Sequence, residues 1–408
     1  AVEGYITSRE KKGYFVEDVS SYRVRRKVAA AMQPEATERE YFADFKANRI
    51  SLQNFPLATW TRLMRETLSV HNEELLKTVP YKGVYELRKA IATYLAHNRA
   101  MEVDPSQIII GAGTEYLYGR LLQMFGHACT SAIEEPGYKK FASISASFGN
   151  PWKYIPIDDN GLMIDKLEES GADVVHLSPA NHFPTGIVMP VTRRLELFEW
   201  VNRIRKRYII EDDYDSEFRY TGRFILPLYA QDTQSRVIYM NTFSKSLVPS
   251  LRISYMVLPP RLLERYEQTM SFYSCTVSSF EQYTLARFIS EGYFERHINK
   301  MKNYYREQRH KILAAIHASP LAAVSQITER NAGTHFVLHI NTKLTEAEVR
   351  KAALAADMCL SFYSDYSHNS EENNGCTLVI NYAAIEADKI AAVIERLSSL
   401  FPECNQIS

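Results

Sequence analysis

The sequence predicts an α/β protein with a large domain on a mostly parallel mixed sheet and a smaller C-terminal α/β domain. From residue 81 onward, short apolar runs typical of buried strands alternate with longer segments of helical periodicity. The 408 residues are 46% hydrophobic and 24% charged, so one large or two closely packed domains can bury a sizeable core. Polar turns follow several of the apolar runs, and strand ends are where open α/β sheets place ligands.

Composition argues against several classes of partner. Lys plus Arg equals Asp plus Glu at 48 each, so no overall charge excess points to nucleic acid or an anionic membrane. No run of about 18 apolar residues occurs, and the first residues lack the order of a secretory signal. The five cysteines are scattered without metal-ligand spacing, which favours free thiols and a cytoplasmic location.

The N-terminal residues alternate apolar and polar side chains around a turn at residues 9–13. This pattern predicts a two-stranded hairpin that pairs residues 5–6 with residues 14–16. Because a lone hairpin is marginal in water, we expect that a segment preceding it is missing. Residues 20–48 are charged and lack a core pattern, so we interpret them as a linker that ends in a short helix. A helix with one apolar face is expected next, over residues 56–67.

The periodicity of the remaining chain predicts the elements of both domains. In the large domain it predicts helices at residues 83–98 and 115–125, and strands at residues 107–110, 132–135, 173–177, 208–214, 237–240 and 251–258. A long amphipathic helix over residues 289–316 is expected to link the two domains. In the smaller domain the pattern predicts strands at 335–340 and 377–382, helices at 345–357 and 387–400, and a polar loop at 363–375.

Two strand ends in the first half of the chain carry candidate ligand-binding residues. The turn at residues 111–114 lies before a helix, so Gly113 and Thr114 can offer backbone N–H groups to an anion. Such turns use glycine for geometry at least as often as for phosphate. Tyr138 follows the next strand, where it can stack on a heteroaromatic ring or simply close a loop.

The strand at residues 208–214 ends in three consecutive acids. Like charges raise one another's pKa, so we expect a cation among them. Because alternate strand residues share a face, Asp212 and Tyr214 should point into one site while Asp213 faces away. A protonated pyridine nitrogen would supply the cation. A solvated strand end and a metal site are the alternatives, and few further metal ligands lie nearby.

Residues 239–255 concentrate hydroxyl groups, a lysine and an arginine. Lys245 follows an apolar strand, and burial there would lower its pKa and make it a nucleophile toward a carbonyl. Thr242 and Ser244 offer hydroxyl donors, and Arg252 offers a fork of donors that matches a phosphate dianion. Taken alone, this segment is equally well a polar loop whose lysine and arginine are solvated.

The order of these features resembles fold-type I pyridoxal-phosphate enzymes, the aminotransferase group, over roughly residues 50–408. More closely, the strings SPANHFPTG, EDDYDSEFRY and TFSKSLVPSLRISYMVLP resemble the effector domain of the MocR subgroup of GntR-type transcriptional regulators. The strings EGYI and GYFV resemble the wing that ends the winged-helix DNA-binding domain of those regulators. The resemblance implies a remnant of that wing at residues 1–19, a linker at 20–50, a cofactor-binding large domain at 51–295 and a small domain at 296–408.

The resemblance also implies pyridoxal 5'-phosphate as cofactor and no metal. Lys245 would be the catalytic residue, as the lysine of the internal aldimine, and Asp212 would pair with the ring nitrogen. Tyr214 would contact the phenolic oxygen with Asn181 as its helper, and Tyr138 would stack on the ring. The phosphate would be held by backbone groups and side chains of Gly113, Thr114, Thr242, Ser244 and Arg252.

Departures from the family shape the expected function. Asn181 stands where the family usually has His, and His182 beside it is more often structural than catalytic. Residues 351–395 contain no arginine, although aminotransferases of this type clamp the substrate carboxylate with one there. We therefore expect little efficient transamination.

The expected protein is the effector domain of a regulator. It would be a homodimer that senses an amine, an amino acid or pyridoxal phosphate itself through Lys245, with Tyr81 as a candidate phosphate contact from the partner subunit. DNA would be bound by the missing N-terminal winged helix, and no membrane would be involved. The alternative is a catalytically active class I/II aminotransferase.

Overall fold

The chain divides into two compact units, residues 1–40 and residues 41–408. The computed structural model describes residues 5–18, 39–46, 54–220, 225–330, 333–368 and 375–406. The first unit contains an antiparallel hairpin of β1 (Ile6–Arg9) and β2 (Gly13–Val16), in which Ile6 pairs with Val16. The predicted hairpin is therefore confirmed, and Gly13 closes its turn with a φ of +90° that favours glycine.

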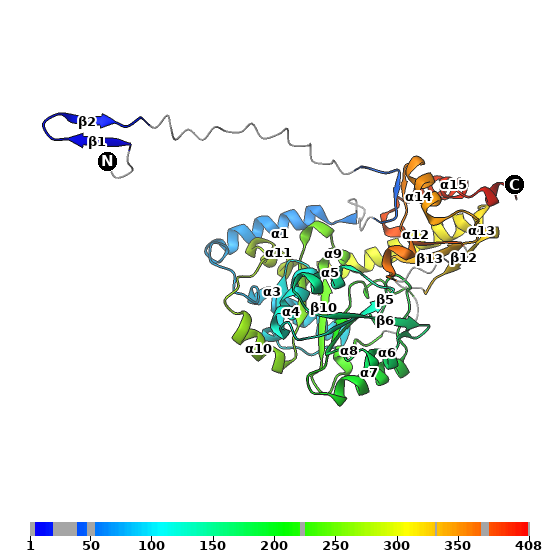
Figure 1. The fold of residues 1–408 in the computed structure, drawn as a ribbon, viewed down its shortest axis with the longest axis horizontal. Helices are drawn as coiled ribbons and strands as arrows, with labels where there is room; N and C mark the ends of the chain where they lie inside the picture. Colours follow the sequence, from blue (N-terminus) through cyan, green and yellow to red (C-terminus); the bar gives the residue numbers. More distant parts are fainter. Residues whose placement is uncertain are drawn as a thin grey trace. The chain divides into compact units, whose positions relative to one another are not determined.

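Within the described part of the second unit, an eight-stranded sheet runs in the order β4-β11-β10-β9-β8-β5-β6-β7 (Figure 1). Strands β10, β9, β8, β5 and β6 are parallel to one another, whereas β11 and β7 run antiparallel to their neighbours. This is the mostly parallel mixed sheet that the sequence predicts. The strands are β4 (Ile108–Gly111), β5 (Ser131–Glu135), β6 (Trp152–Asp158), β7 (Gly161–Leu162), β8 (Val174–Leu177), β9 (Tyr208–Asp212), β10 (Val237–Thr242) and β11 (Ser254–Val257).

Helices cover both faces of this sheet because successive strand residues point to opposite sides. Ile238 and Met240 belong to the core beneath α4, α5 and α10. Tyr239, between them, belongs to the opposite core with α1, α3, α11 and α12, and Val237 lies on that same face beneath α6 and α7. The helices are α1 (Leu57–Val70), α3 (Tyr85–Arg99), α4 (Thr114–Phe125), α5 (Lys140–Ser147), α6 (Ile164–Glu169), α7 (Val191–Arg203), α10 (Pro260–Met270), α11 (Ser279–Ser290) and α12 (Tyr293–His317).

Helix α12 leads to a smaller antiparallel sheet in the order β12-β13-β15. The helix predicted over residues 289–316 is wrong at its start, because α11 ends at Ser290 and α12 begins at Tyr293. Gly292 separates them with a φ of +73°, a left-handed conformation that interrupts a helix. The smaller domain contains α13 (Leu321–Val324), β12 (Ser325–Thr328), β13 (His335–Ile340), α14 (Glu346–Ala355), β14 (Met358–Cys359), β15 (Cys376–Asn381) and α15 (Ile390–Ser399).

The described end of the predicted linker forms a strand instead of the expected short helix. Strand β3 (Ala43–Asp44) pairs in parallel with β14, and the Phe45 N–H donates to the Cys359 carbonyl at 2.9 Å. Phe45 is only 1% exposed, so burial of its ring anchors this segment. Residues 20–38 and 47–50 of the predicted linker lie outside the described residues. The segment before the large domain is thus held by the smaller domain.

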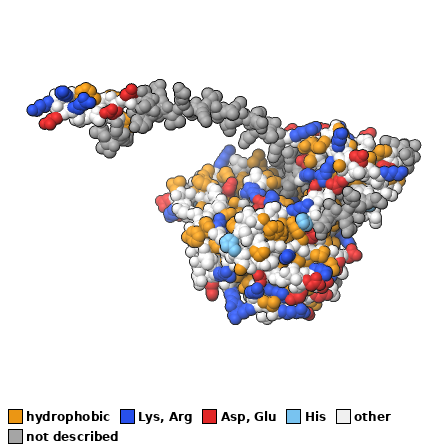
Figure 2. Space-filling view, in the orientation of Figure 1, with side chains coloured by type: hydrophobic (Ala, Val, Ile, Leu, Met, Phe, Trp, Pro, Cys, Tyr) orange, Lys and Arg blue, Asp and Glu red, His pale blue; other side chains and the backbone are white. Residues whose placement is uncertain are grey.

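Short elements connect the main ones, and the second unit exposes charges of both signs. Figure 2 shows acidic and basic side chains interspersed over its visible face.

All five cysteines carry free thiols, as predicted. None of the helices in the described ranges is long and apolar enough to span a bilayer. The short elements are α2 (Asn72–Leu75), η3 (Pro105–Gln107), α8 (Leu228–Gln231), α9 (Phe243–Ser246), η4 (Pro249–Leu251), η5 (Tyr363–Tyr366), η6 (Tyr382–Ala384) and η7 (Pro402–Gln406).

Candidate functional site

A cavity of about 270 Å³ lies at the carboxyl ends of the parallel strands, where segments of the large and small domains meet. Residues that end or follow β5, β8, β9 and β10 line it, together with residues of β15. Of the ten residues predicted for the site, Asn181 alone does not line this cavity. The nine that do are Gly113, Thr114, Tyr138, Asp212, Tyr214, Thr242, Ser244, Lys245 and Arg252.

Lys245 lies on α9, the single helical turn that follows β10. Thr242 ends the strand, and its Oγ1 accepts a hydrogen bond from the Ser244 N–H at 3.2 Å, which caps this turn. The Lys245 Nζ lies 5.7 Å from the centroid of the Tyr214 ring. Burial lowers the pKa of Lys245, although the carboxylates of Asp215 and Asp212 raise it. A lowered pKa increases the fraction of neutral amine, which is the form that attacks a carbonyl.

Asp212 is buried at the end of β9 with one carboxylate oxygen unpaired. Its Oδ2 lies 3.5 Å from the Nε2 of His176, whereas Oδ1 has no hydrogen-bond partner within the described ranges. Asp213 faces the other way, accepts a hydrogen bond from the Tyr239 hydroxyl at 2.7 Å and pairs with Arg99. The predicted alternation is therefore confirmed. An unpaired buried carboxylate oxygen is costly, so Asp212 fits a cationic group placed in the cavity.

The opposite end of the site suits an anion. Gly113 precedes α4 with a φ of +97°, and a Cβ there would lie 2.5 Å from the Nη2 of Arg252. Glycine thus lets the guanidinium lie against the turn, beside the N–H groups that begin α4 at Thr114. Arg252 pairs with Glu115 at 3.2 Å, and the buried Ser244 Oγ lacks a partner among the described residues. A helix N-terminus, a hydroxyl and a guanidinium therefore converge as a phosphate would need.

Asn181 lies behind Tyr214, outside the cavity. The Tyr214 hydroxyl donates to the Asn181 carbonyl at 3.1 Å, and the Asn181 Nδ2 donates to Asp215 Oδ2 at 2.7 Å. A Cβ at Gly333 would lie 2.3 Å from that Nδ2, so the smaller domain packs closely on the Asn181 side chain. Phe183, two residues on, lines the cavity instead. Asn181 can therefore orient Tyr214 but does not reach the cavity itself.

Tyr138 occupies the rim of the cavity, and two deeper rings lie behind it. Its side chain is 42% exposed and meets Phe141 edge to face, with ring centroids 5.7 Å apart. Phe141 in turn packs on His176 with centroids 3.8 Å apart. His176 was not singled out in the sequence. The available signal was a polar residue within the apolar run of β8, because polar side chains are seldom buried and a buried one indicates a specific role.

Glu134 is a second lining residue that sequence reasoning missed. It is buried near the carboxyl end of β5, and its Oε2 accepts a hydrogen bond from the Ser178 N–H at 3.0 Å. The pKa of Glu134 is raised to about 8, chiefly by burial and also by Asp212, against the lowering effect of the hydrogen bond from Ser178. Burial also lowers the pKa of His182 to about 4. The 3.6 Å contact between these two side chains is therefore no ion pair at neutral pH.

Substituting Glu134 by glutamine should make stability less dependent on pH. Folding raises the pKa of Glu134 from 4.5 to about 8. The contribution of this carboxyl to the stability of the wild-type protein is therefore greatest below pH 4.5, where it is protonated in both states, and falls as the pH rises toward 8. Between pH 4.5 and 8, the unfolding free energy of Glu134→Gln should rise relative to that of wild type by up to about 1.4 kcal/mol per pH unit. Urea unfolding of the protein without added cofactor measures the difference. Glu199→Gln on exposed α7 is the control, and an equal pH dependence in Glu134→Gln and wild type would contradict the prediction.

The described residues contain no group of three or more His, Cys, Asp or Glu side chains arranged to hold a metal ion. Cationic side chains instead accompany the acids at the end of β9. Arg99 pairs with Asp213 on one side of the strand, and Lys245 interacts with Asp212 on the other. The arrangement can bind a compound that combines an anionic group, a basic nitrogen and a carbonyl that reacts with an amine.

Comparison with known proteins gives consistent likenesses. The family model for aminotransferase class I and II matches residues 44–397. The chain is 35% identical over 402 residues to YdeL, an uncharacterized HTH-type transcriptional regulator of Bacillus subtilis (strain 168), covering 98% of this chain and 86% of that protein. It is 30% identical over 417 residues to the probable rhizopine catabolism regulatory protein MocR of Rhizobium meliloti, covering 98% and 83%. The multiple substrate aminotransferase of Thermococcus profundus shares the fold, with a TM-score of 0.79, 24% identity, and coverage of 91% of this chain and 94% of that chain.

Proposed function

The chain belongs to the aminotransferase class I and II family and to its MocR-like group of HTH-type transcriptional regulators, and on that basis we propose that it is a pyridoxal phosphate-binding effector domain. One observation carries the proposal: a single cavity brings a half-buried lysine of lowered pKa together with a buried carboxylate oxygen that lacks a described partner. A pyridine ring with an aldehyde matches both groups at once. The ligand sensed would be an amine, an amino acid or pyridoxal phosphate itself.

Each lining residue would have a distinct part in holding the cofactor. Pyridoxal phosphate, when bound, supplies an aldehyde that reacts with primary amines and a ring that withdraws electrons. Lys245 would hold the aldehyde carbon covalently, and Asp212 would keep the ring nitrogen protonated. Tyr214 would donate its hydroxyl proton to the phenolic oxygen in place of the Asn181 carbonyl, and the Asn181 Nδ2, which donates to that hydroxyl at 3.4 Å, would orient it. The phosphate would be held by groups of Gly113, Thr114, Thr242, Ser244 and Arg252, and Tyr138 would cover the ring.

The lining of the cavity supports a regulator over an efficient aminotransferase. Strand β15 contributes Val379 and Asn381 to the lining, and neither can clamp a carboxylate as an arginine does. The rival function, an active aminotransferase, is supported by the lysine and acid pair, which both functions need. The absence of arginine from residues 351–395 supports sensing over efficient transamination.

Signalling would require DNA binding and a change between conformations of a dimer. The β1–β2 hairpin supports a winged-helix wing at the N-terminal end. Exposed apolar side chains at Leu57 and Val70 of α1, and at Leu76 directly after α2, support a homodimer that would cover them. Ligand binding in the cavity would favour one dimer conformation and so reposition the DNA-binding parts.

A turnover assay separates the two functions. The protein loaded with pyridoxal phosphate is mixed with a panel of amino acids and 2-oxoglutarate, and both absorbance and keto-acid formation are followed. A sensing domain should give an absorbance change with no more than about one keto acid formed per site, because it lacks the carboxylate clamp. Sustained formation of keto acid over many turnovers would reject the sensing function in favour of the aminotransferase. Lys245→Ala serves as the blank in both measurements.

A further inference from the structure

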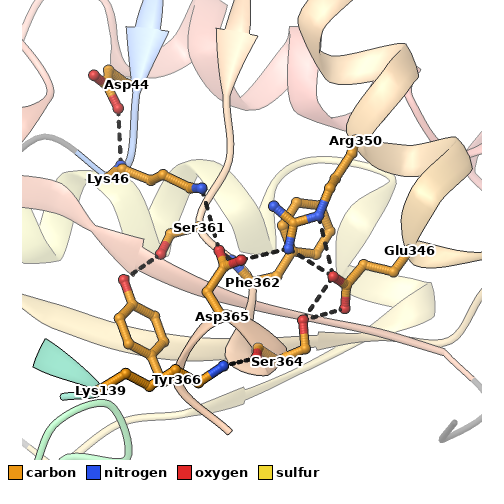
Figure 3. A network of polar contacts seen from close by, with 10 residues as sticks. All are labelled: Asp44, Lys46, Lys139, Glu346, Arg350, Ser361, Phe362, Ser364, Asp365 and Tyr366. Carbon is orange, nitrogen blue, oxygen red and sulfur yellow. Dashed lines mark hydrogen bonds and ion pairs between the residues drawn. The ribbon is translucent and has the colours of Figure 1, made fainter. Parts of the chain in front are cut away.

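Lys46 lines the same cavity from a segment that is hydrogen-bonded to the smaller domain. It follows β3, where the buried Phe45 donates its N–H to the Cys359 carbonyl at 2.9 Å. The Lys46 N–H donates to the Asp44 Oδ1 at 3.0 Å, which fixes the turn. Its side chain is 44% exposed, so the backbone is fixed while the ammonium group can reorient. Figure 3 shows Lys46 extending from this turn toward Asp365.

The ion pair between Lys46 and Asp365 is long, and Asp365 has other hydrogen-bond donors. The Nζ lies 3.5 Å from the Asp365 Oδ2. Asp365 also accepts hydrogen bonds from Arg350 Nη2 at 2.7 Å and from the Phe362 N–H at 3.0 Å (Figure 3). These two contacts hold Asp365 whether or not Lys46 is present. Lys46 can therefore transfer to another anion without unpairing a carboxylate.

The segment at residues 361–366 closes the side of the cavity where Lys46 lies. The Tyr366 carbonyl accepts from the Gly137 N–H at 2.9 Å, so this segment is tied to the loop after β5. The hydroxyls of Ser361 and Tyr366 lie 2.8 Å apart, and both residues line the cavity (Figure 3). Lys46 thus has neutral hydrogen-bonding groups beside it, contributed by the smaller domain. Arg252 lies beside Thr114 in the large domain, so the two cationic side chains Lys46 and Arg252 belong to different parts of the cavity wall.

The charge of the lining shows why a further anion would need Lys46. Besides Glu134, which burial keeps protonated at neutral pH, Glu115 and Asp212 line the cavity, and a ligand carboxylate brought near their carboxylates is repelled unless a cation accompanies it. Under the proposed function Arg252 holds the phosphate, and Lys245 lies at the aldehyde carbon, where the amine of the effector and not its carboxylate has to be. Lys46 is the remaining lysine or arginine among the lining residues that the structure describes.

We propose that Lys46 binds the carboxylate of the effector, so that the effector is an amino acid and not a simple amine. Lys46 would take the part of the arginine that β15 lacks. The inference rests on the proposed function, because it assumes that the cofactor occupies Lys245 and Arg252. Ligand binding would replace Asp365 with the ligand carboxylate as the partner of Lys46.

Reduced conjugates of the cofactor test this without any covalent step. The protein freed of cofactor is titrated calorimetrically with N-(5'-phosphopyridoxyl)-L-alanine, with the β-alanine conjugate and with the ethylamine conjugate, which lacks the carboxylate. Wild type should bind the better carboxylate conjugate about tenfold or more tightly than the ethylamine conjugate. Lys46→Gln should lose this preference. The matched control, Lys46→Arg, should keep most of it.

Several outcomes distinguish the two proposals. Equal binding of the three conjugates by wild type, or a preference that persists in Lys46→Gln, would overturn the role of Lys46 and leave the cofactor proposal standing. Failure of wild type to bind any conjugate would overturn the cofactor proposal and the Lys46 inference with it. Asp365→Asn is a second variant that frees Lys46 from its carboxylate. It should tighten the carboxylate conjugates and leave the ethylamine conjugate unchanged, and the reverse result would contradict the inference.

Discussion

Replacing Lys245 with alanine is expected to abolish covalent attachment of pyridoxal phosphate. The Lys245 side chain is half-buried in the cavity, and its desolvation there lowers its pKa toward the reactive neutral form. Wild type incubated with the cofactor and then reduced with borohydride should carry the phosphopyridoxyl group on the peptide that contains residue 245. Lys245→Ala should show neither this modification nor the visible absorbance of the attached cofactor.

The matched control is Lys139→Ala. Lys139 lies close by, with its Nζ donating to the Ser364 carbonyl at 3.2 Å, but it does not line the cavity. That variant should attach the cofactor as wild type does. Modification of Lys46 or another lysine in the wild type would show that Lys245 is not the anchor. Binding of the ethylamine conjugate by Lys245→Ala would show that the loss of attachment does not come from unfolding.

Local sequence rules located most of the cavity because strand ends and strand alternation are local properties. Asp212 and Lys245 were predictable since each follows an apolar run, and the carboxyl ends of parallel strands meet at one edge of a sheet. The spacing of two residues between Asp212 and Tyr214 also fixed their shared face.

The rest depended on contacts between distant parts of the chain. Strand β3 pairs with β14, and the Phe42 N–H bonds to Asp357, 315 residues away, so the described end of the linker forms a strand where a short helix was predicted. Asn181 was expected at the cofactor, yet Gly333 of the smaller domain packs against its amide and the loop turns Phe183 inward instead. Lys46 is an ordinary linker lysine by sequence alone. Its place in the cavity follows from that same long-range pairing.

Arg99→Met is expected to give the largest loss of stability, because Arg99 compensates two buried carboxylates. Its Nη2 lies 3.4 Å from Asp213 Oδ2 and 3.4 Å from Glu217 Oε1, and all three side chains are almost fully buried. Burial alone would lower the pKa of Arg99, but Asp213 and Glu217 raise it well above its usual value. Removing the guanidinium leaves two buried carboxylates without a cation, so the unfolding free energy should fall by about 3–5 kcal/mol in urea denaturation.

The control for charge removal as such is Arg62→Met, because Arg62 pairs with Glu66 on the exposed surface of α1, where ion pairs contribute little. A loss of similar size in both variants would mean that methionine disturbs helices and not that buried acids are stranded. Adding Asp213→Asn and Glu217→Gln to Arg99→Met should recover part of the loss, since neutral amides need no cation. Asp213 is adjacent to Asp212, so the same triple variant separates stability from cofactor binding. If the acids behind the strand serve only the fold, the triple variant should still bind the ethylamine conjugate as wild type does.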